Sequence, residues 1–273
     1  MSWRRPRADQ ASGDVVPMSR VKILAGLGVC LLAVLVLLAG LGYTLVASFA
    51  GSPAAASGAS RTAVASLDPA QRRDQLAAAP MVSVAADAGM TPQIAISLPP
   101  AIILPTGTVA GPGSVATGFP HTPLGAAAQL AAIDERVLTA MSLPLAGEVY
   151  QAWALNGGVG AAAWTQTRNV QSFLTHARQS SNVKDPGTLV SVSTAAVQIK
   201  ATDGPDWVVA CVLLDVRAAF KDEARMGYGT CERMQWSETR WLIGPGSEPA
   251  LAPSTWPGSD ISVAAGWQPV NPR

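Results

Sequence analysis

The sequence predicts an α+β domain that is attached to a single transmembrane helix. Residues 23–50 form a run without a charged side chain, apolar residues recur at helical spacing between 122 and 179, and β-branched residues dominate between 188 and 243. Helices that precede a set of strands in the chain are typical of the α+β class, in which the helices cover one face of an antiparallel sheet. We expect about three helices and about four strands.

The charge-free run, 23–50, is long enough to cross a bilayer. At about 1.5 Å of rise per residue, its 28 residues exceed the hydrocarbon layer of about 30 Å. Five basic and two acidic residues precede it, so the positive-inside rule keeps residues 1–22 in the cytoplasm. The rest of the chain is then extracytoplasmic, and the protein is expected in the cell membrane.

A cleaved signal peptide is the alternative interpretation of this run. Ala54, Ala55 and Ala56 offer small residues to a signal peptidase. However, the apolar part of a signal peptide is only about 7 to 15 residues long, so we expect an uncleaved signal anchor. Cys30 is interpreted as a lipid-embedded thiol rather than a lipidation site, because Val29 precedes it where a small residue is expected.

Small residues recur at heptad spacing along the predicted membrane helix. They are Gly26, Ala33, Gly40 and Ala47. Such a stripe lets a second helix approach closely, which would favour a homo-oligomer or packing against another membrane protein. Because the whole chain is rich in Ala and Gly, an accidental alignment is the alternative.

Charge and motifs exclude several classes of function. After residue 50 the chain has 14 basic against 16 acidic residues, without the basic stripe that nucleic acid requires, so no direct nucleic-acid partner is expected. His121 and His176 have no Cys or carboxylate at ligand spacing, so neither a metal nor another cofactor is predicted. Nucleophile elbows, phosphate-binding loops and zinc-protease motifs are missing from the sequence, which indicates a protein that is not an enzyme.

Residues 51–117 are rich in Ala, Ser, Pro and Gly, and this composition predicts a mostly flexible stalk. Two parts of it are exceptions. Asp68 can cap a short helix that continues to Ala79, with Pro69 in its first turn. We expect a second, apolar part to pack on the domain or on a partner; it contains Ile94, Ile96, Leu98, Ile102, Ile103 and Leu104.

The folded domain is predicted to span residues 118–246. Thr122 caps a first helix that continues to Met141. Two shorter helices are expected over 148–155 and 162–179, and four strands over 188–200, 207–216, 228–236 and 241–243. The apolar side chains before and after Thr194 would point to opposite faces of a regular strand, which predicts a β-bulge there. The tail, 247–273, carries Trp256 and Trp267 and is expected to lie on the domain as an ordered strap.

Cys211 and Cys231 are the two cysteines that follow the membrane segment. On the oxidising side of a membrane such a pair can form a disulfide, and both fall on neighbouring predicted strands. Their midpoint is Lys221, whereas the polar turn is predicted over 221–225, so direct pairing requires an asymmetric loop or a bulge. The sequence therefore does not decide whether the disulfide forms, because the two Cα atoms must lie within about 7 Å of each other.

Two sets of residues are candidates for chemistry or binding. Asp215 lies in an apolar strand and, with Tyr150 or Tyr228 nearby, would suit an acid–base enzyme; a strand-end carboxylate that faces solvent is the alternative. Five tryptophans are candidates for an interface or a ligand groove, although such residues often fill a core. They are Trp207, Trp236, Trp241, Trp256 and Trp267.

Several short motifs stand out between residues 118 and 268: Gly118–Pro123 with Gly125 and Ala126, Arg233–Trp236, Ser254–Ser259 and Ala265–Trp267. These motifs are similar to those of membrane-anchored proteins of actinobacterial integrative and conjugative elements. The helical opening and the terminal hairpin with Trp236 and Trp241 also resemble the nuclear-transport-factor-2-like cone. TcpC-class scaffold subunits of conjugative type IV secretion systems combine such a cone with one membrane helix.

This resemblance implies a non-enzymatic scaffold or accessory component of a conjugative DNA-transfer apparatus, with other membrane proteins of that apparatus as partners. It transfers no catalytic residue to this chain. The alternative is a membrane-tethered protein whose cone binds a small apolar ligand or a lipid. An enzyme that uses Asp215 is the third hypothesis.

Overall fold

The computed structural model describes residues 67–219 and 223–271. All of these residues belong to the second of two units of the chain, Val64–Arg273. The predicted membrane segment, 23–50, and its stripe of Gly26, Ala33, Gly40 and Ala47 lie outside the described residues. Within the part of the chain that is described, no helix is long and apolar enough to span a bilayer.

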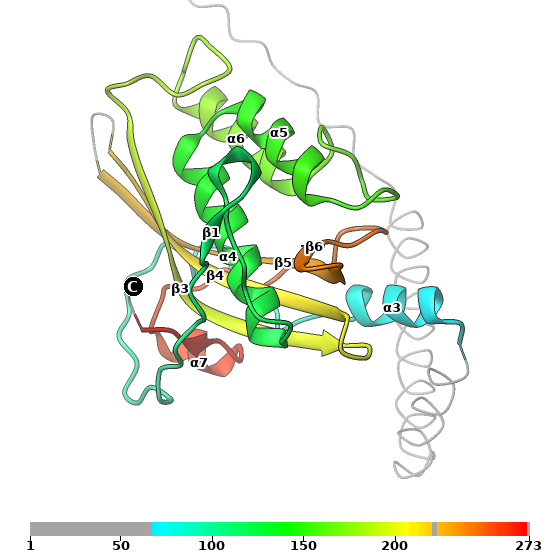
Figure 1. Cartoon of the computed structure of the whole chain (residues 1–273). Coiled ribbons are helices and arrows are strands. Elements are labelled where there is room, and N and C mark those ends of the chain that lie inside the picture. The colour runs from blue at the N-terminus through cyan, green and yellow to red at the C-terminus, as the bar shows by residue number, and fades with distance from the viewer. Residues whose placement is uncertain (1–66, 220–222, 272–273) are drawn as a thin grey trace, which may run out of the picture. The chain divides into compact units, whose positions relative to one another are not determined.

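The second unit is an α+β fold built on a five-stranded antiparallel sheet (Figure 1). The strands are β3 Leu189–Thr202, β4 Trp207–Ala219, β5 Glu223–Ser237, β6 Arg240–Ile243 and β7 Gln268–Pro269, in the spatial order β6-β5-β4-β3-β7. The first four form the meander that the change of period predicts. The fifth, β7, was not predicted, because a two-residue strand has no measurable periodicity.

Strand β3 changes register at two places. One shift lies between Thr194 and Ala196, where the parity of the valines predicts a bulge, and the other lies between Ile199 and Ala201. At the first shift the backbone N–H and the hydroxyl of Thr194 both donate to Oε1 of Glu135, at 2.8 and 2.7 Å. A bulge bends and twists its strand, and this carboxylate attaches the bend to the helical layer.

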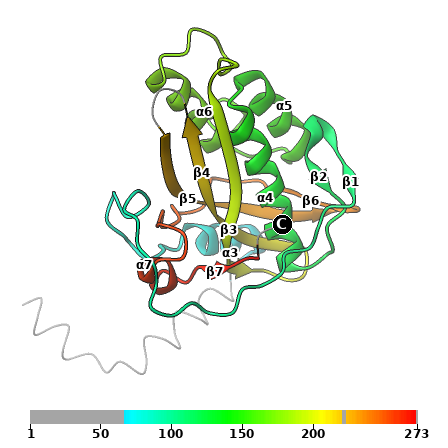
Figure 2. The ribbon, with the colours of Figure 1, turned by 90° about the vertical axis from the view of Figure 1, so that its left-hand side faces the viewer.

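Three helices, α4 Pro123–Ala140, α5 Leu143–Trp153 and α6 Thr165–His176, pack with one face of the sheet in a common core (Figure 2). Thr122 caps α4 as the sequence predicts, since its Oγ1 accepts from the N–H of Gly125 at 3.1 Å. Helix α5 begins five residues before its predicted start of 148. The reason is Ser142, whose hydroxyl accepts from the N–H of Leu145 at 3.3 Å and so caps the earlier turn.

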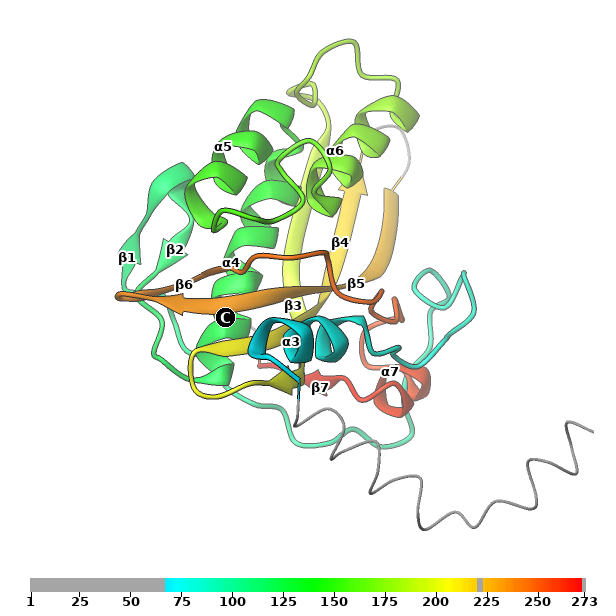
Figure 3. The same cartoon turned by 90° about the vertical axis from the view of Figure 1, so that its right-hand side faces the viewer.

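The opposite face of the sheet is covered as well, by α3 Pro69–Ala78 and the C-terminal segment that contains α7 Asp260–Ala264 (Figure 3). This layer corrects the expectation that helices cover only one face. Residues of alternate parity on β4 enter two different cores, Val212 with the helices and Leu213 with the second layer. The almost wholly apolar sequence of β4 follows from this double burial.

Residues 67–117 belong to the compact unit although their composition predicts a flexible stalk. Arg72 and Arg73 each pair with Asp203, with closest distances of 2.8 Å, and the N–H of Ile102 donates to the carbonyl of Pro269 at 2.9 Å. The short elements β1 Val109–Ala110, η1 Pro112–Ser114 and β2 Ala116–Thr117 follow. The predicted boundary near Gly118 therefore lies inside the unit, because contacts with distant parts of the chain hold this segment.

Candidate functional site

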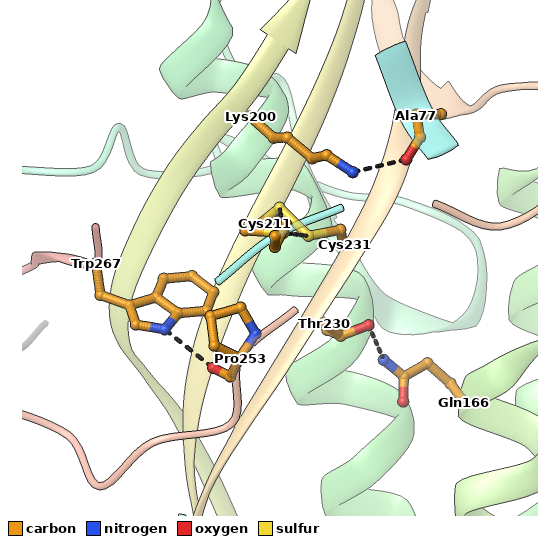
Figure 4. Close-up of a disulfide and its surroundings, with 9 residues drawn as sticks. Ala77, Gln166, Lys200, Cys211, Thr230, Cys231, Pro253 and Trp267 are labelled. Atoms are coloured by element: carbon orange, nitrogen blue, oxygen red, sulfur yellow. Dashed lines mark hydrogen bonds between the residues drawn. A yellow bond between two sulfur atoms is a disulfide. The ribbon is translucent and has the colours of Figure 1, made fainter. Parts of the chain in front are cut away.

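Cys211 and Cys231 form a disulfide between β4 and β5, on the sheet face opposite α4 to α6 (Figure 4). They are direct cross-strand partners with a Cα–Cα distance of 4.0 Å. The sequence-based objection to this register was wrong, because β5 begins at Glu223 rather than at Tyr228. The connection 220–222 is centred on Lys221, which is also the midpoint of the two cysteines.

A third sulfur lies beside the disulfide. The thioether of Met81 is 3.5 Å from Sγ of Cys231 and 4.0 Å from Sγ of Cys211. Cys211 is fully buried and Cys231 nearly so, while Met81 is half-buried. Trp267 belongs to the same core and donates its indole N–H to the carbonyl of Pro253 at 3.0 Å.

Two surface hollows each include one residue of this sulfur cluster in their lining. Met81 lines one of about 450 Å³, and Cys231 lines another of about 210 Å³. Residues 250–252 and Ser254 form a wall that both hollows share. The cluster is therefore a largely buried group of soft atoms, with one hollow beside Met81 and another beside Cys231.

A second cluster, of buried polar side chains, lies on the other face of the sheet. Thr230 and Cys231 are adjacent in β5 and point to opposite faces, as strand geometry requires (Figure 4). The amide of Gln166 donates to Asp134 at 3.0 Å and approaches Thr230 at 3.5 Å. The indole N–H of Trp164 donates to Oε1 of Glu232 at 2.7 Å.

Burial changes the acidity of three groups in this polar cluster. Loss of solvation raises the pKa of Glu232 to about 8, against the hydrogen bond from Trp164. Burial, with the nearby charge of Glu232, raises the pKa of Asp134 well above its ordinary value. Burial also raises the pKa of Tyr228 to about 12. Near pH 7 Glu232 is therefore largely protonated, which removes the cost of one buried charge, and the raised pKa of Asp134 favours its protonated form in the same way.

The structure does not assemble the predicted acid–base set. Asp215 accepts from Arg225 at 2.8 Å and from Arg217 at 3.0 Å. Burial acts to raise the pKa of Asp215, but hydrogen bonds from both guanidiniums outweigh it, and the pKa lies below its ordinary value. Tyr228 pairs with Leu214 in the sheet and therefore lies on the opposite face from Asp215. Asp215 is a paired carboxylate.

The five candidate tryptophans do not form one groove. Trp207 and Trp267 lie in the core beside the disulfide, and Trp241 lies in the core under the helices. Trp236 is half-buried and stacks on His121 with a centroid distance of 4.3 Å. The ring of Trp256 lies 4.5 Å from the guanidinium carbon of Arg225. Three of the five therefore fill cores.

Comparisons with protein-family models, with curated proteins and with solved structures found no match. No activity, ligand or partner is therefore transferred to this chain from a relative.

The histidines occupy separate environments. His121 contacts a carboxylate oxygen of Asp206 at 2.7 Å through Nε2, and His176 is exposed on α6. Among residues 67–219 and 223–271, no group of three or more His, Cys, Asp or Glu side chains is arranged to hold a metal ion.

Sequence reasoning missed the buried polar cluster, although one signal for part of it was present. Tyr228, Met234 and Trp236 alternate on β5 with the same parity as Glu232. An acid between apolar residues of equal parity faces the core. Asp134 and Gln166 carry no comparable signal, because each also fits the polar side of a helix.

Proposed function

We propose that the protein is a membrane-tethered, extracytoplasmic scaffold or accessory component of a conjugative DNA-transfer apparatus, and that it is not an enzyme. Residues 23–50 provide the tether, and the basic residues before them keep the amino end in the cytoplasm. The disulfide supports an extracytoplasmic position for the α+β unit, because disulfides persist on the oxidising side of a membrane.

The observation that carries this proposal is a row of exposed aliphatic side chains. Ile94, Ile96 and Leu98 are 88%, 96% and 49% exposed, and Ile103 is 78% exposed. All four lie in one short segment, 94–103, that belongs to no helix and that bends at Ile96 and Ser97. Large apolar side chains that gather on a surface mark an interaction site.

This apolar row is held on the domain through its backbone. The N–H of Ala95 donates to the carbonyl of Gly258 at 2.8 Å, and the N–H of Ile96 donates to the carboxylate of Asp260 at 3.0 Å. Ile102 exchanges backbone hydrogen bonds with Pro269 and Asn271. A segment that is already ordered loses less conformational entropy when a partner binds.

The expected occupant of the apolar row is another protein of the same membrane assembly. Residues 88–117 contain no charged side chain, so the complementary surface should be apolar and uncharged. An anionic lipid surface fits less well, because the carboxylate of Asp260 lies directly beside the row.

The packing of the described core beside Glu232 leaves little room for the alternative, a lipid held between the helices and the sheet. Trp153, Trp164 and Trp241 are completely buried in the core between the helices and the sheet. The hollow beside Trp164 and Glu232 has a volume of about 10 Å³, which is about the space of one water molecule.

Photocrosslinking in donor cells tests the proposal. A benzoylphenylalanine at position 96 should form an adduct with a membrane protein of the transfer apparatus. The same probe at Leu189, an exposed aliphatic residue of β3, serves as the matched control. Ile96→Asp should weaken the interface by about 2 kcal/mol, roughly 30-fold in affinity, and reduce transfer frequency. Normal transfer by Ile96→Asp without any adduct at position 96 would refute this role.

A further inference from the structure

The sulfur cluster has a composition that a structural disulfide does not require. A structural disulfide needs two cysteines, and here a thioether lies within 4.0 Å of both sulfurs. Thiolate and thioether ligands together select soft cations, of which Cu(I) is the main biological example. Zn²⁺ usually takes four protein ligands in a closed site, and no further Cys, His, Asp or Glu completes such a set in the described part of the chain.

The sulfur spacing fits a three-coordinate metal ion. With metal–sulfur bonds of about 2.3 Å, as in thiolate complexes, three sulfurs in a planar triangle lie about 4.0 Å apart. The observed distances from Met81 to Cys231 and Cys211 are 3.5 and 4.0 Å. Two sides of the triangle are therefore close to the required length. The third side lengthens when the disulfide is reduced, because the two sulfurs are then no longer bonded.

We propose that Cys211, Cys231 and Met81 bind one Cu(I) ion when the disulfide is reduced. A dithiol reductant supplies two electrons and two protons, which converts the disulfide to two thiols and the reductant to its own disulfide. Binding of Cu(I) then releases both thiol protons and forms two copper–thiolate bonds and one copper–thioether bond. The same three sulfurs thus have two alternative states, a disulfide without metal and a copper complex.

The surroundings suit both the entry of the ion and its charge. One surface hollow is lined by Met81 and another by Cys231, so an ion has only a short distance to travel from the surface to the sulfurs. A Cu(I) ion with two thiolates carries one negative charge. Figure 4 shows the side chain of Lys200 passing on the same face of the sheet, where its ammonium donates to the carbonyl of Ala77 at 2.6 Å. This cation lowers the cost of the buried negative complex.

The test uses the full-length chain in detergent with Cys30→Ser, so that the third cysteine does not compete. The protein is reduced with a dithiol under anaerobic conditions, freed of the reductant, and titrated with Cu(I) against a coloured Cu(I) chelator. We expect the reduced form to take one Cu(I) per chain from the chelator and the oxidised form to take none. Met81→Leu removes one of the three ligands and should weaken binding by at least roughly 10-fold, which is the smallest loss typical of groups that only support a ligand.

Met90→Leu is the matched control, because Met90 is 57% exposed and is not part of the sulfur cluster. It should bind Cu(I) as the parent does. Equal affinity in Met81→Leu and Met90→Leu would overturn the three-sulfur site, as would tighter binding of Zn²⁺ than of Cu(I). If the reduced chain loses its fold, Cu(I) should restore the circular dichroism of the native state; failure to restore it would also overturn the proposal.

Discussion

Trp164 and Glu232 join the helical layer to the sheet through a hydrogen bond of 2.7 Å from the indole N–H to the carboxyl Oε1. The two residues are 68 positions apart in the chain, and both are buried. Burial raises the pKa of Glu232 to about 8, although the hydrogen bond from Trp164 and the charge of Arg233 act against it. The core of the domain therefore contains a carboxyl group that changes its charge near neutral pH.

Stability should fall as the pH rises towards 8. The pKa of Glu232 is about 8 in the folded state and near 4.5 when unfolded, so between these values only the folded chain holds the proton. Its contribution is complete below about pH 4.5 and is lost as the pH rises through 8, at roughly 1.4 kcal/mol per pH unit. The raised pKa of Asp134 acts in the same direction. Urea unfolding followed by tryptophan fluorescence between pH 5 and 9 measures this slope.

Glu232→Gln should reduce that slope, because a glutamine keeps the acceptor for Trp164 and does not titrate. Glu238→Gln, an exposed residue in the turn before β6, is the control and should leave the slope unchanged. An identical pH dependence in Glu232→Gln would show that this carboxyl is not the source. Since the protein is proposed not to be an enzyme, folded Glu232→Gln should also support transfer.

Asp215→Asn should change the acid side of the stability profile and leave function intact. The pKa of Asp215 is lowered by its two arginines, so its contribution is present above about pH 3.8 and is lost as the pH falls. We expect a loss of roughly 1 kcal/mol at pH 7, because Arg217 and Arg225 are exposed enough for solvent screening. Denaturation at pH 3 and 7 measures the difference. A loss of transfer by a variant with normal stability would instead support a chemical role for Asp215.

Removing the disulfide should destabilise the α+β unit by about 3 kcal/mol. The bridge closes a loop of 20 residues, and the chain-entropy estimate for that length gives this figure. The double change Cys211→Ala with Cys231→Ala is used because serines at these buried positions would leave hydroxyl groups without hydrogen-bond partners. Urea unfolding of the oxidised parent and of the double variant measures the loss. A difference below about 0.5 kcal/mol would mean that the unfolded chain gains little freedom.

Loss of the Asp203 carboxylate should loosen α3 selectively. Asp203 accepts from both Arg72 and Arg73, and removing its charge leaves two neighbouring cations without their partner. The free energy of local opening of α3 should fall by about 1 to 2 kcal/mol. Hydrogen exchange of the α3 amides in Asp203→Asn, compared with the exposed control Asp185→Asn, measures this. Unchanged exchange would mean that apolar packing of Ala77 holds the helix.

Some local features were readable from the sequence because their causes are local. Thr122, Pro123 and the apolar period that follows place the start of α4 within one residue of the observed helix. The unbroken apolar sequence after Trp207 predicts a strand that is buried on both faces, and β4 is one. The parity change near Thr194 locates the first bulge of β3. Each signal acts over a few residues, through a cap, a side-chain period or a fixed dihedral angle.

By itself the sequence determined the α+β class, the cap of α4, the order of the long strands and the first bulge. Only the tertiary structure decided the register that joins Cys211 to Cys231, the attachment of residues 67–117, the fifth strand and the acidity of Glu232. The physical reason is distance along the chain. Local signals act between neighbours, whereas Met81 lies 130 residues from Cys211 and Arg72 lies 131 from Asp203. Contacts of that kind depend on how the whole chain packs, and no short pattern encodes them.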